Sequence, residues 1–268
     1  MAAAALENNH SAQKPSSHTK KQPKSSSSAT DLPFDNHNGR ARRRWAALVI
    51  SLCGVGFLLL RIHVASLRAG SLAQGLGFLS HFFTILTNTA VSLAMGWTAH
   101  QERTAVTLRN KNSSSEPRGG GRGIAITPLV WLALVSAILG VGIVYHVALK
   151  HLRTLPPGLE KVADEGVHTV IPLLALAWWM LFEHRPVEFW AGFKACIVWP
   201  AGYGIYILIR ANLFGGFYPY PFLNLPKIGL AQFAVNVLVL GLVFGTLGLG
   251  LLFAKQQIRK MYSKPNAD

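Results

Sequence analysis

The chain has 268 residues, half of them hydrophobic, and its formal net charge is +15. A soluble domain of this size does not normally combine such hydrophobicity with such a charge, so the two properties must be segregated along the chain. The basic residues flank apolar segments, as they do in membrane proteins, and therefore no nucleic-acid partner is expected.

The N-terminal tail, residues 1–44, is rich in Ser, Lys and small residues and has almost no aromatic or β-branched content. Such a composition cannot bury enough surface to fold, so the tail is predicted to be disordered. It does not have the pattern of a signal peptide, because no apolar run follows a short basic start. The arginines from Arg40 to Arg44 stand just before the first apolar segment and are expected at the membrane surface.

Apolar segments long enough to cross about 30 Å of hydrocarbon recur along the chain. They are Trp45–Leu67, Gly77–Trp97, Ile124–Leu149, Val167–Phe182, Gly192–Phe214 and Ile228–Ala254. Barrel strands would be about half as long with alternating polarity, so these segments are predicted to be helices. The predicted fold is an all-α bundle of six transmembrane helices over residues 45–254, followed by a short basic tail, residues 255–268.

The distribution of positive charge predicts the orientation. Most of the 26 Lys and Arg residues lie in the two tails and in the second and fourth loops. Because cytoplasmic loops carry the excess of Lys and Arg, both termini are predicted to be cytoplasmic. The expected location is a membrane that the chain crosses several times.

With this orientation, the strongly polar residues of the apolar segments gather near the outer side of the membrane. They are Arg61, His63, His81, Thr84, Thr87, Asn88, Tyr145, His146, Asp164, His168, Arg210, Asn212, Gln232 and Asn236. Cys53 and Cys196 fall in the inner halves, so neither a disulfide framework nor a thiolate metal site is indicated.

Helical spacing groups some of these residues. His81, Thr84 and Asn88 differ by three and four positions, which predicts one shared face of the second helix with Thr87 at its edge. Asp164 lies one turn before His168, so its carboxylate is positioned to orient the imidazole.

Three separated motifs resemble a known family. The segments His81–Asn88, Asp164–Pro172 and Tyr218–Phe222 resemble the bacterial six-helix membrane family Pr-six-Pr, whose biochemical role is unassigned. More remotely, the layout is similar to the androgen-induced and androgen-dependent membrane hydrolases of animals. Those enzymes cleave fatty acid esters of hydroxy fatty acids with a membrane-embedded Thr and a His. The resemblance implies that Thr84 is this Thr and His168 this His. The resemblance to a bacterial family also implies a bacterial inner membrane as the location.

The residue types allow the same chemistry without any family. A Thr hydroxyl becomes a nucleophile when a neighbouring base takes its proton, and an oriented His is the usual base. The predicted catalytic residues are Thr84, His168 and Asp164, with Thr87 left open as the nucleophile. Accessory or substrate-binding residues are expected among Thr87, Asn88, Arg61, His81, Tyr145, His146, Arg210, Tyr218 and Tyr220. No cofactor is expected, and the expected partners are membrane lipid and a lipid-like ester.

Other interpretations remain open at this stage. The outer polar residues also suit the vestibule of a transporter or channel. His146, Asp164 and His168, with His63 or His81, are suitable zinc ligands for a metal-dependent hydrolase. A non-catalytic membrane protein is the last alternative, in which Thr84 and Thr87 only pack, Arg61 and Arg210 reach for the interface, and Tyr218–Phe222 forms an aromatic belt.

Overall fold

A computed structural model describes residues 37–111, 125–152, 155 and 157–263 of the chain. The chain divides into two units, residues 1–32 and 33–268, and the first unit lies outside the described residues, as does most of the tail predicted to be disordered. In the described residues all regular structure is helical, which confirms the predicted all-α class. The α-helices are α1 His37–Ala69, α2 Leu72–Leu79, α3 Phe83–Lys111, α4 Pro128–Val144, α5 Leu159–Glu165, α6 Ile171–Phe182, α7 Phe189–Leu213 and α8 Leu225–Ser263.

Two π-helical segments extend these helices. The segment η1, Tyr145–Leu149, continues α4, and η3, Gly166–Val170, joins α5 to α6. Short 3₁₀ segments follow at η2, Lys150–Leu152, and η4, Pro221–Leu223. Single-turn π segments inside helices are rare and are frequent at functional sites, so the pair marks a region of interest.

Within the described part of the chain, five helical segments are long and apolar enough to cross a membrane, and α2 with α3 forms a sixth candidate that is bent by 95°. The second predicted span, Gly77–Trp97, is therefore not one straight helix. Its first residues belong to α2, and the chain turns over Ser80–Phe82 before α3 begins. The turn also removes His81 from the helical face that was predicted to carry Thr84 and Asn88.

The helix ends extend beyond the apolar segments. The first helix begins at His37, so the basic residues Arg40–Arg44 are helical, and α8 continues to Ser263. The fourth span starts at Leu159 and includes Asp164, which precedes the apolar run. These differences arise because the limits of a helix depend on backbone conformation and not on hydropathy. For example, α5 begins directly after Gly158, whose φ of 128° is outside the helical range.

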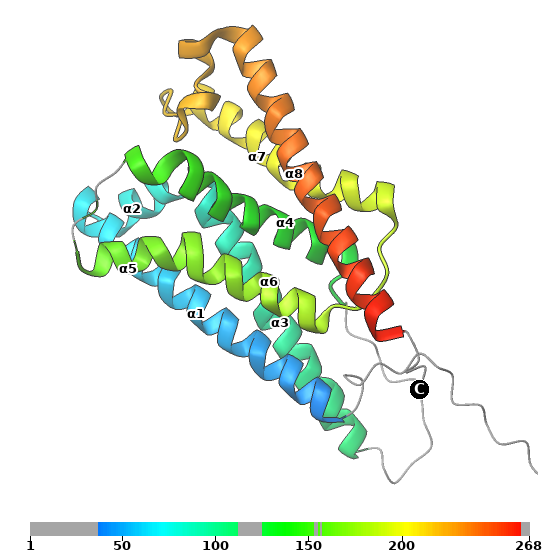
Figure 1. Cartoon of the computed structure of the whole chain (residues 1–268). Helices are drawn as coiled ribbons and strands as arrows, with labels where there is room; N and C mark the ends of the chain where they lie inside the picture. Colours follow the sequence, from blue (N-terminus) through cyan, green and yellow to red (C-terminus); the bar gives the residue numbers. More distant parts are fainter. Residues whose placement is uncertain (1–36, 112–124, 153–154, 156, 264–268) are drawn as a thin grey trace, which may run out of the picture. The chain divides into compact units, whose positions relative to one another are not determined.

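The helices pack in two groups around α4. The first helix packs against α2, α3, α5 and α6, while α7 and α8 pack against each other and against α4 (Figure 1). The start of α1 and the end of α8 lie at the same end of the bundle, as an even number of crossings requires (Figure 1). The largest buried apolar cluster, which includes Met95, Trp131, Trp178 and Trp179, fills the half of the bundle near those ends.

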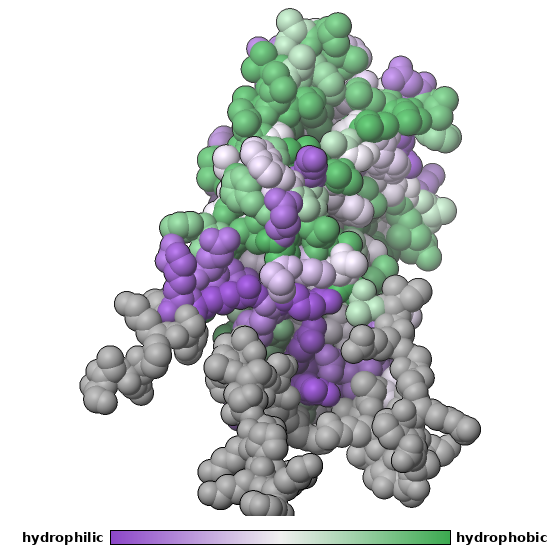
Figure 2. Space-filling model, turned by 90° about the vertical axis from the view of Figure 1, so that its right-hand side faces the viewer, coloured by the Kyte–Doolittle hydropathy of each residue, from purple (hydrophilic) through white to green (hydrophobic). Residues whose placement is uncertain are grey.

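The outward faces of the helices are strongly apolar. Leu52, Leu59, Leu238, Leu242 and Phe253 are all more than half exposed. Figure 2 shows hydrophobic residues over most of one face of the helices and hydrophilic residues gathered in a band toward one end. Exposed apolar area of this extent is typical of a lipid-facing surface, and the chain is a multi-pass membrane protein.

Candidate active site

The break between α2 and α3 is held in place by side chains of α7. Three backbone carbonyls around the break, those of Gly77, Ser80 and His81, accept hydrogen bonds. Their donors are Arg210 Nη2 (3.0 Å to Gly77), the Tyr206 hydroxyl (3.1 Å to Ser80) and the Tyr203 hydroxyl (2.7 Å to His81). Thr84 follows directly in the first turn of α3. Its position therefore depends on α7 as well as on its own helix.

Thr84 meets His168 at the centre of the site. The Thr84 hydroxyl oxygen lies 3.3 Å from His168 Nε2, and both residues are buried. His168 Nδ1 lies 2.9 Å from the backbone carbonyl of Asp164, which can only accept a hydrogen bond. Nδ1 therefore carries the ring proton, and Nε2 is left as the acceptor for the Thr84 hydroxyl. This tautomer is the one that a general base needs.

The carboxylate of Asp164 has a different place from the one predicted. Its Oδ1 is 3.6 Å from His168 Nδ1, beyond hydrogen-bond range, and 3.4 Å from Arg61 Nη1. The backbone carbonyl of Asp164, rather than its carboxylate, thus orients the imidazole. The carboxylate, only 2% exposed, neutralises Arg61 and stands close enough to favour a positive charge on the ring.

The two π-helical segments lie against each other and fix the imidazole from the side. The ring of Tyr145 in η1 stacks on that of His168 in η3, with centroids 4.0 Å apart and planes 12° from parallel. Next to them His146 Nε2 lies 2.9 Å from the hydroxyl of Thr169, which donates to Glu165. The extra residue of each π turn is not visible in hydropathy or spacing, so this pairing could not be predicted.

Asn88 ties the two halves of the site together. Its side-chain nitrogen donates to the carbonyl of Thr84 at 2.8 Å and to that of Val167 at 3.0 Å. The residue is fully buried, so these hydrogen bonds are not exchanged with water. Asn88 is a positioning residue that links α3 to η3.

A cavity of about 250 Å³ lies over the Thr84 and His168 side chains. Arg61, Tyr145 and Tyr220 also line it, and they supply the possible donors to a negatively charged oxygen. Tyr220 is in hydrogen-bond contact with Thr84, and burial raises the pKa of the Tyr220 hydroxyl. A proton donor, a base and a hydroxyl thus line one cavity.

The structure places the other predicted residues outside this chamber. The Thr87 hydroxyl accepts a hydrogen bond from Trp199 Nε1 at 3.0 Å, so Thr84 is the hydroxyl that meets His168. His81 Nε2 accepts from Arg210 Nε at 2.8 Å, and both residues hold the helix break. His146 and Tyr218 do not line the chamber. Arg210 does not line the chamber either.

The ligands proposed for a metal site are not brought together. Among the residues that the structure describes, no group of three or more His, Cys, Asp or Glu side chains is close enough to hold a metal ion. His63 is exposed, and His81 is engaged by Arg210.

A second buried polar cluster lies at the opposite end of the bundle. Glu183 is 2% exposed and accepts hydrogen bonds from Arg185, while Lys255 donates to the carbonyl of Trp179. Burial is the largest single influence and opposes ionisation of Glu183, but the hydrogen bonds and charge of Arg185 together with the charge of Arg43 lower the pKa of the carboxyl. Arg43 of α1 approaches the same carboxylate at 4.0 Å. Buried polar residues therefore occur at both ends of the bundle and not only at the end where the sequence predicted them. Glu183 and Lys255 lie just past the predicted apolar segments.

Comparison with known proteins adds no assignment. No protein-family model matches the chain, and neither a curated protein nor a solved structure does so.

Proposed function

We propose that this membrane protein is a hydrolase that cleaves lipid-like esters with Thr84 as nucleophile and His168 as base. The observation that carries the proposal is the ordered contact from Thr84 Oγ1 to His168 Nε2, 3.3 Å, and from His168 Nδ1 to the Asp164 carbonyl, 2.9 Å. A nucleophile, its base and a group that fixes the base are the parts that acyl transfer needs. The resemblance to the membrane threonine hydrolases assigns Thr84 and His168 the same roles.

The proposed reaction has two halves. Thr84 Oγ bonds to the ester carbonyl carbon while its proton moves to His168 Nε2, and the tetrahedral intermediate expels the alcohol, which takes that proton. Water then attacks the acyl-Thr84 ester and gives a proton to His168, which returns it to Thr84 as the acid leaves. Arg61, Tyr145 and Tyr220, which line the chamber, are the candidate donors to the negatively charged oxygen.

The transporter or channel interpretation has less support. A continuous route would need polar groups through the whole bundle, whereas Met95, Trp131, Trp178 and Trp179 pack in a buried apolar cluster beyond the chamber. The proposed partners are membrane lipid and an ester lipid, and the proposed location is a bacterial inner membrane.

A covalent probe tests the nucleophile. A fluorophosphonate probe should label the detergent-purified protein, and Thr84→Ala should abolish labelling and lower ester hydrolysis by at least about 10³-fold. Thr87→Ala tests the competing hydroxyl. Thr89→Ala is the matched control, because Thr89 is on the same helix and bonds only to the carbonyl of Ile85 in its own helix.

The outcomes separate cleanly. Labelling retained in Thr87→Ala and Thr89→Ala but lost in Thr84→Ala supports the proposal. Labelling that persists in a Thr84→Ala protein that still elutes as a single folded species would contradict the assignment of Thr84 as the nucleophile.

A further inference from the structure

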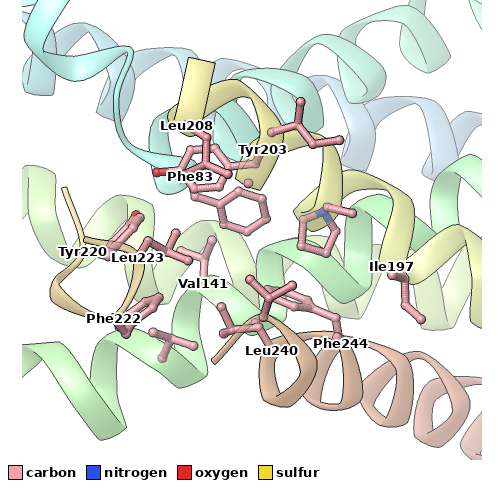
Figure 3. Close-up of a pocket in the computed structure, with 18 of the residues that line it drawn as sticks. Phe83, Val141, Ile197, Tyr203, Leu208, Tyr220, Phe222, Leu223, Leu240 and Phe244 are labelled. Atoms are coloured by element: carbon pink, nitrogen blue, oxygen red, sulfur yellow. The ribbon is translucent and has the colours of Figure 1, made fainter. Parts of the chain in front are cut away.

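A second cavity, of about 320 Å³, begins where the active-site chamber ends. It lies between α4, α7 and α8, and its lining is apolar except at a few positions such as Thr84, Tyr203 and Tyr220 (Figure 3). Thr84, Leu149 and Tyr220 line both cavities. The proposed nucleophile thus stands at the boundary between a polar space and an apolar one.

The apolar cavity runs along α7 from Tyr220, which is in hydrogen-bond contact with Thr84. Figure 3 shows Tyr220 and Phe222 at one end of it and Ile197 at the other, with Phe83 and Tyr203 between them. An elongated apolar space with one reactive end fits a hydrocarbon chain better than a compact solute. Hydrocarbon is also what surrounds a membrane-spanning bundle at this depth.

Two glycines keep the cavity open. A Cβ atom added at Gly204 of α7 or at Gly241 of α8 would meet no other group within 4 Å, and both residues line the cavity. Gly140 is different, because its Cβ would lie 2.2 Å from the ring of Phe244, so this glycine allows α4 to pack closely. Gly204 and Gly241 are therefore positions where a side chain would occupy the cavity rather than displace a neighbour.

We propose that this cavity binds the hydrocarbon chain of the acid half of the ester, with its carbonyl carbon at Thr84, and that Gly204 and Gly241 determine the chain length accepted. The inference rests on the proposed function and adds to it the place of the acyl chain and the residues that limit its length. The carbonyl would lie at the Thr84 end, and the alcohol would leave through the chamber lined by Arg61 and His168.

Filling the cavity is the test. Gly204→Leu and Gly241→Leu are compared with Gly202→Leu and Gly250→Leu, which are exposed, lie on the same two helices and have equally open Cβ positions outside the cavity. The substrates are 4-nitrophenyl esters from acetate to palmitate. Wild type and both controls should prefer long chains. Either cavity variant should keep its acetate rate within about twofold and lose at least about tenfold in kcat/KM on palmitate, since each lost chain contact weakens transition-state binding.

A readout that needs no hydrolysis accompanies the kinetics. A stearic acid that carries a diazirine near its end should cross-link to α4, α7 or α8 residues of the cavity, as mapped by mass spectrometry. Gly204→Leu or Gly241→Leu should reduce this cross-linking at least fivefold, whereas Gly202→Leu and Gly250→Leu should leave it unchanged.

The results distinguish the two proposals. Variant-sensitive cross-linking without hydrolysis of any ester supports the chain site and overturns the hydrolase. Hydrolysis that depends on Thr84 but shows the same chain-length profile in all four variants overturns the chain site alone. Cross-linking that the cavity and control variants reduce equally means that bulk lipid covers an ordinary helix face, and also overturns it.

Discussion

At the scale of single residues, the site depends on where one proton is held. The carbonyl of Asp164 accepts from His168 Nδ1 and leaves Nε2 facing Thr84. In the familiar serine triad this task belongs to a carboxylate, and its loss as Asp→Asn lowers kcat by about 10⁴. Here a backbone carbonyl, which no side-chain substitution removes, does the orienting. The Asp164 carboxylate is left to balance Arg61 and to favour the imidazolium.

This arrangement predicts a mild effect of Asp164→Asn. We expect a loss of roughly tenfold in kcat/KM, because the imidazole keeps its tautomer and only the charge stabilisation is lost, against about 10²- to 10⁴-fold for His168→Ala. Ester hydrolysis by the two purified variants measures the difference. If Asp164→Asn were as damaging as His168→Ala in a folded protein, the carboxylate and not the carbonyl would be the orienting group.

At the scale of elements, the site is assembled by local departures from regular helix. The α2–α3 break sets Thr84, and the π segments η1 and η3 set Tyr145 and His168. Close packing against neighbouring helices holds these irregular segments in position. A Cβ at Gly166 in η3 would lie 2.2 Å from the ring of Phe57 in α1, so only glycine lets η3 approach α1 this closely. Arg210 and Tyr203 stabilise the α2–α3 break, because they donate hydrogen bonds to backbone carbonyls that a continuous helix would otherwise pair.

Gly166→Ala should therefore destabilise the protein and disturb the site. Overpacking costs about 1–3 kcal/mol, whereas alanine in an open helical position stabilises by about 0.4–1 kcal/mol relative to glycine. Gly56→Ala is the matched control, since a Cβ at that exposed position of α1 has nothing within 4 Å. Thermal melts in one detergent should show a lower midpoint for Gly166→Ala and an equal or higher one for Gly56→Ala. Equal midpoints for both would show that Phe57 moves aside freely.

At the scale of the whole molecule, the candidate site lies at one end of the bundle. That end holds the Thr84 chamber and the apolar cavity that adjoins it. Ion pairs occur at both ends: Arg61 with Asp164 and Lys150 with Glu165 at the chamber end, Glu183 with Arg185 at the other. Between the two ends lies the buried apolar cluster of Trp131, Trp178 and their neighbours. The positive-inside rule predicts that the end where α1 begins and α8 ends is cytoplasmic and that the chamber is on the outer side.

Two loop prolines test this orientation. Pro157, before α5, and Pro186, between α6 and α7, are both exposed and lie at opposite ends of the bundle. In a background without Cys53 and Cys196, Pro157→Cys should react with a membrane-impermeant maleimide in intact cells. Pro186→Cys should react only after the membrane is permeabilised. The reverse pattern would place the chamber on the cytoplasmic side.

Hydropathy over 20-residue windows predicted the all-α class and a chain that crosses the membrane several times, because unpaired backbone in hydrocarbon leaves helices as the main solution. Counting along single helices paired Thr84 with Asn88 and Asp164 with His168, since residues one turn apart share a face. Counting could not choose between Thr84 and Thr87, and the roles of Thr84 and His168 were implied by the resemblance. Spacing is local information, and it misplaced the Asp164 carboxylate, which lies 3.6 Å from His168 Nδ1.

The packing of the folded chain sets which groups meet. Thr84 rather than Thr87 faces His168, and His81 and Arg210 hold a helix break instead of lining the site. The break and the two π segments each shift the phase of a helix, so a face counted at 100° per residue no longer predicts direction beyond them. The apolar cavity beside Thr84 arises where α4 meets α7 and α8, which come much later in the chain. Packing between such distant segments depends on three-dimensional contacts that hydropathy and spacing do not encode.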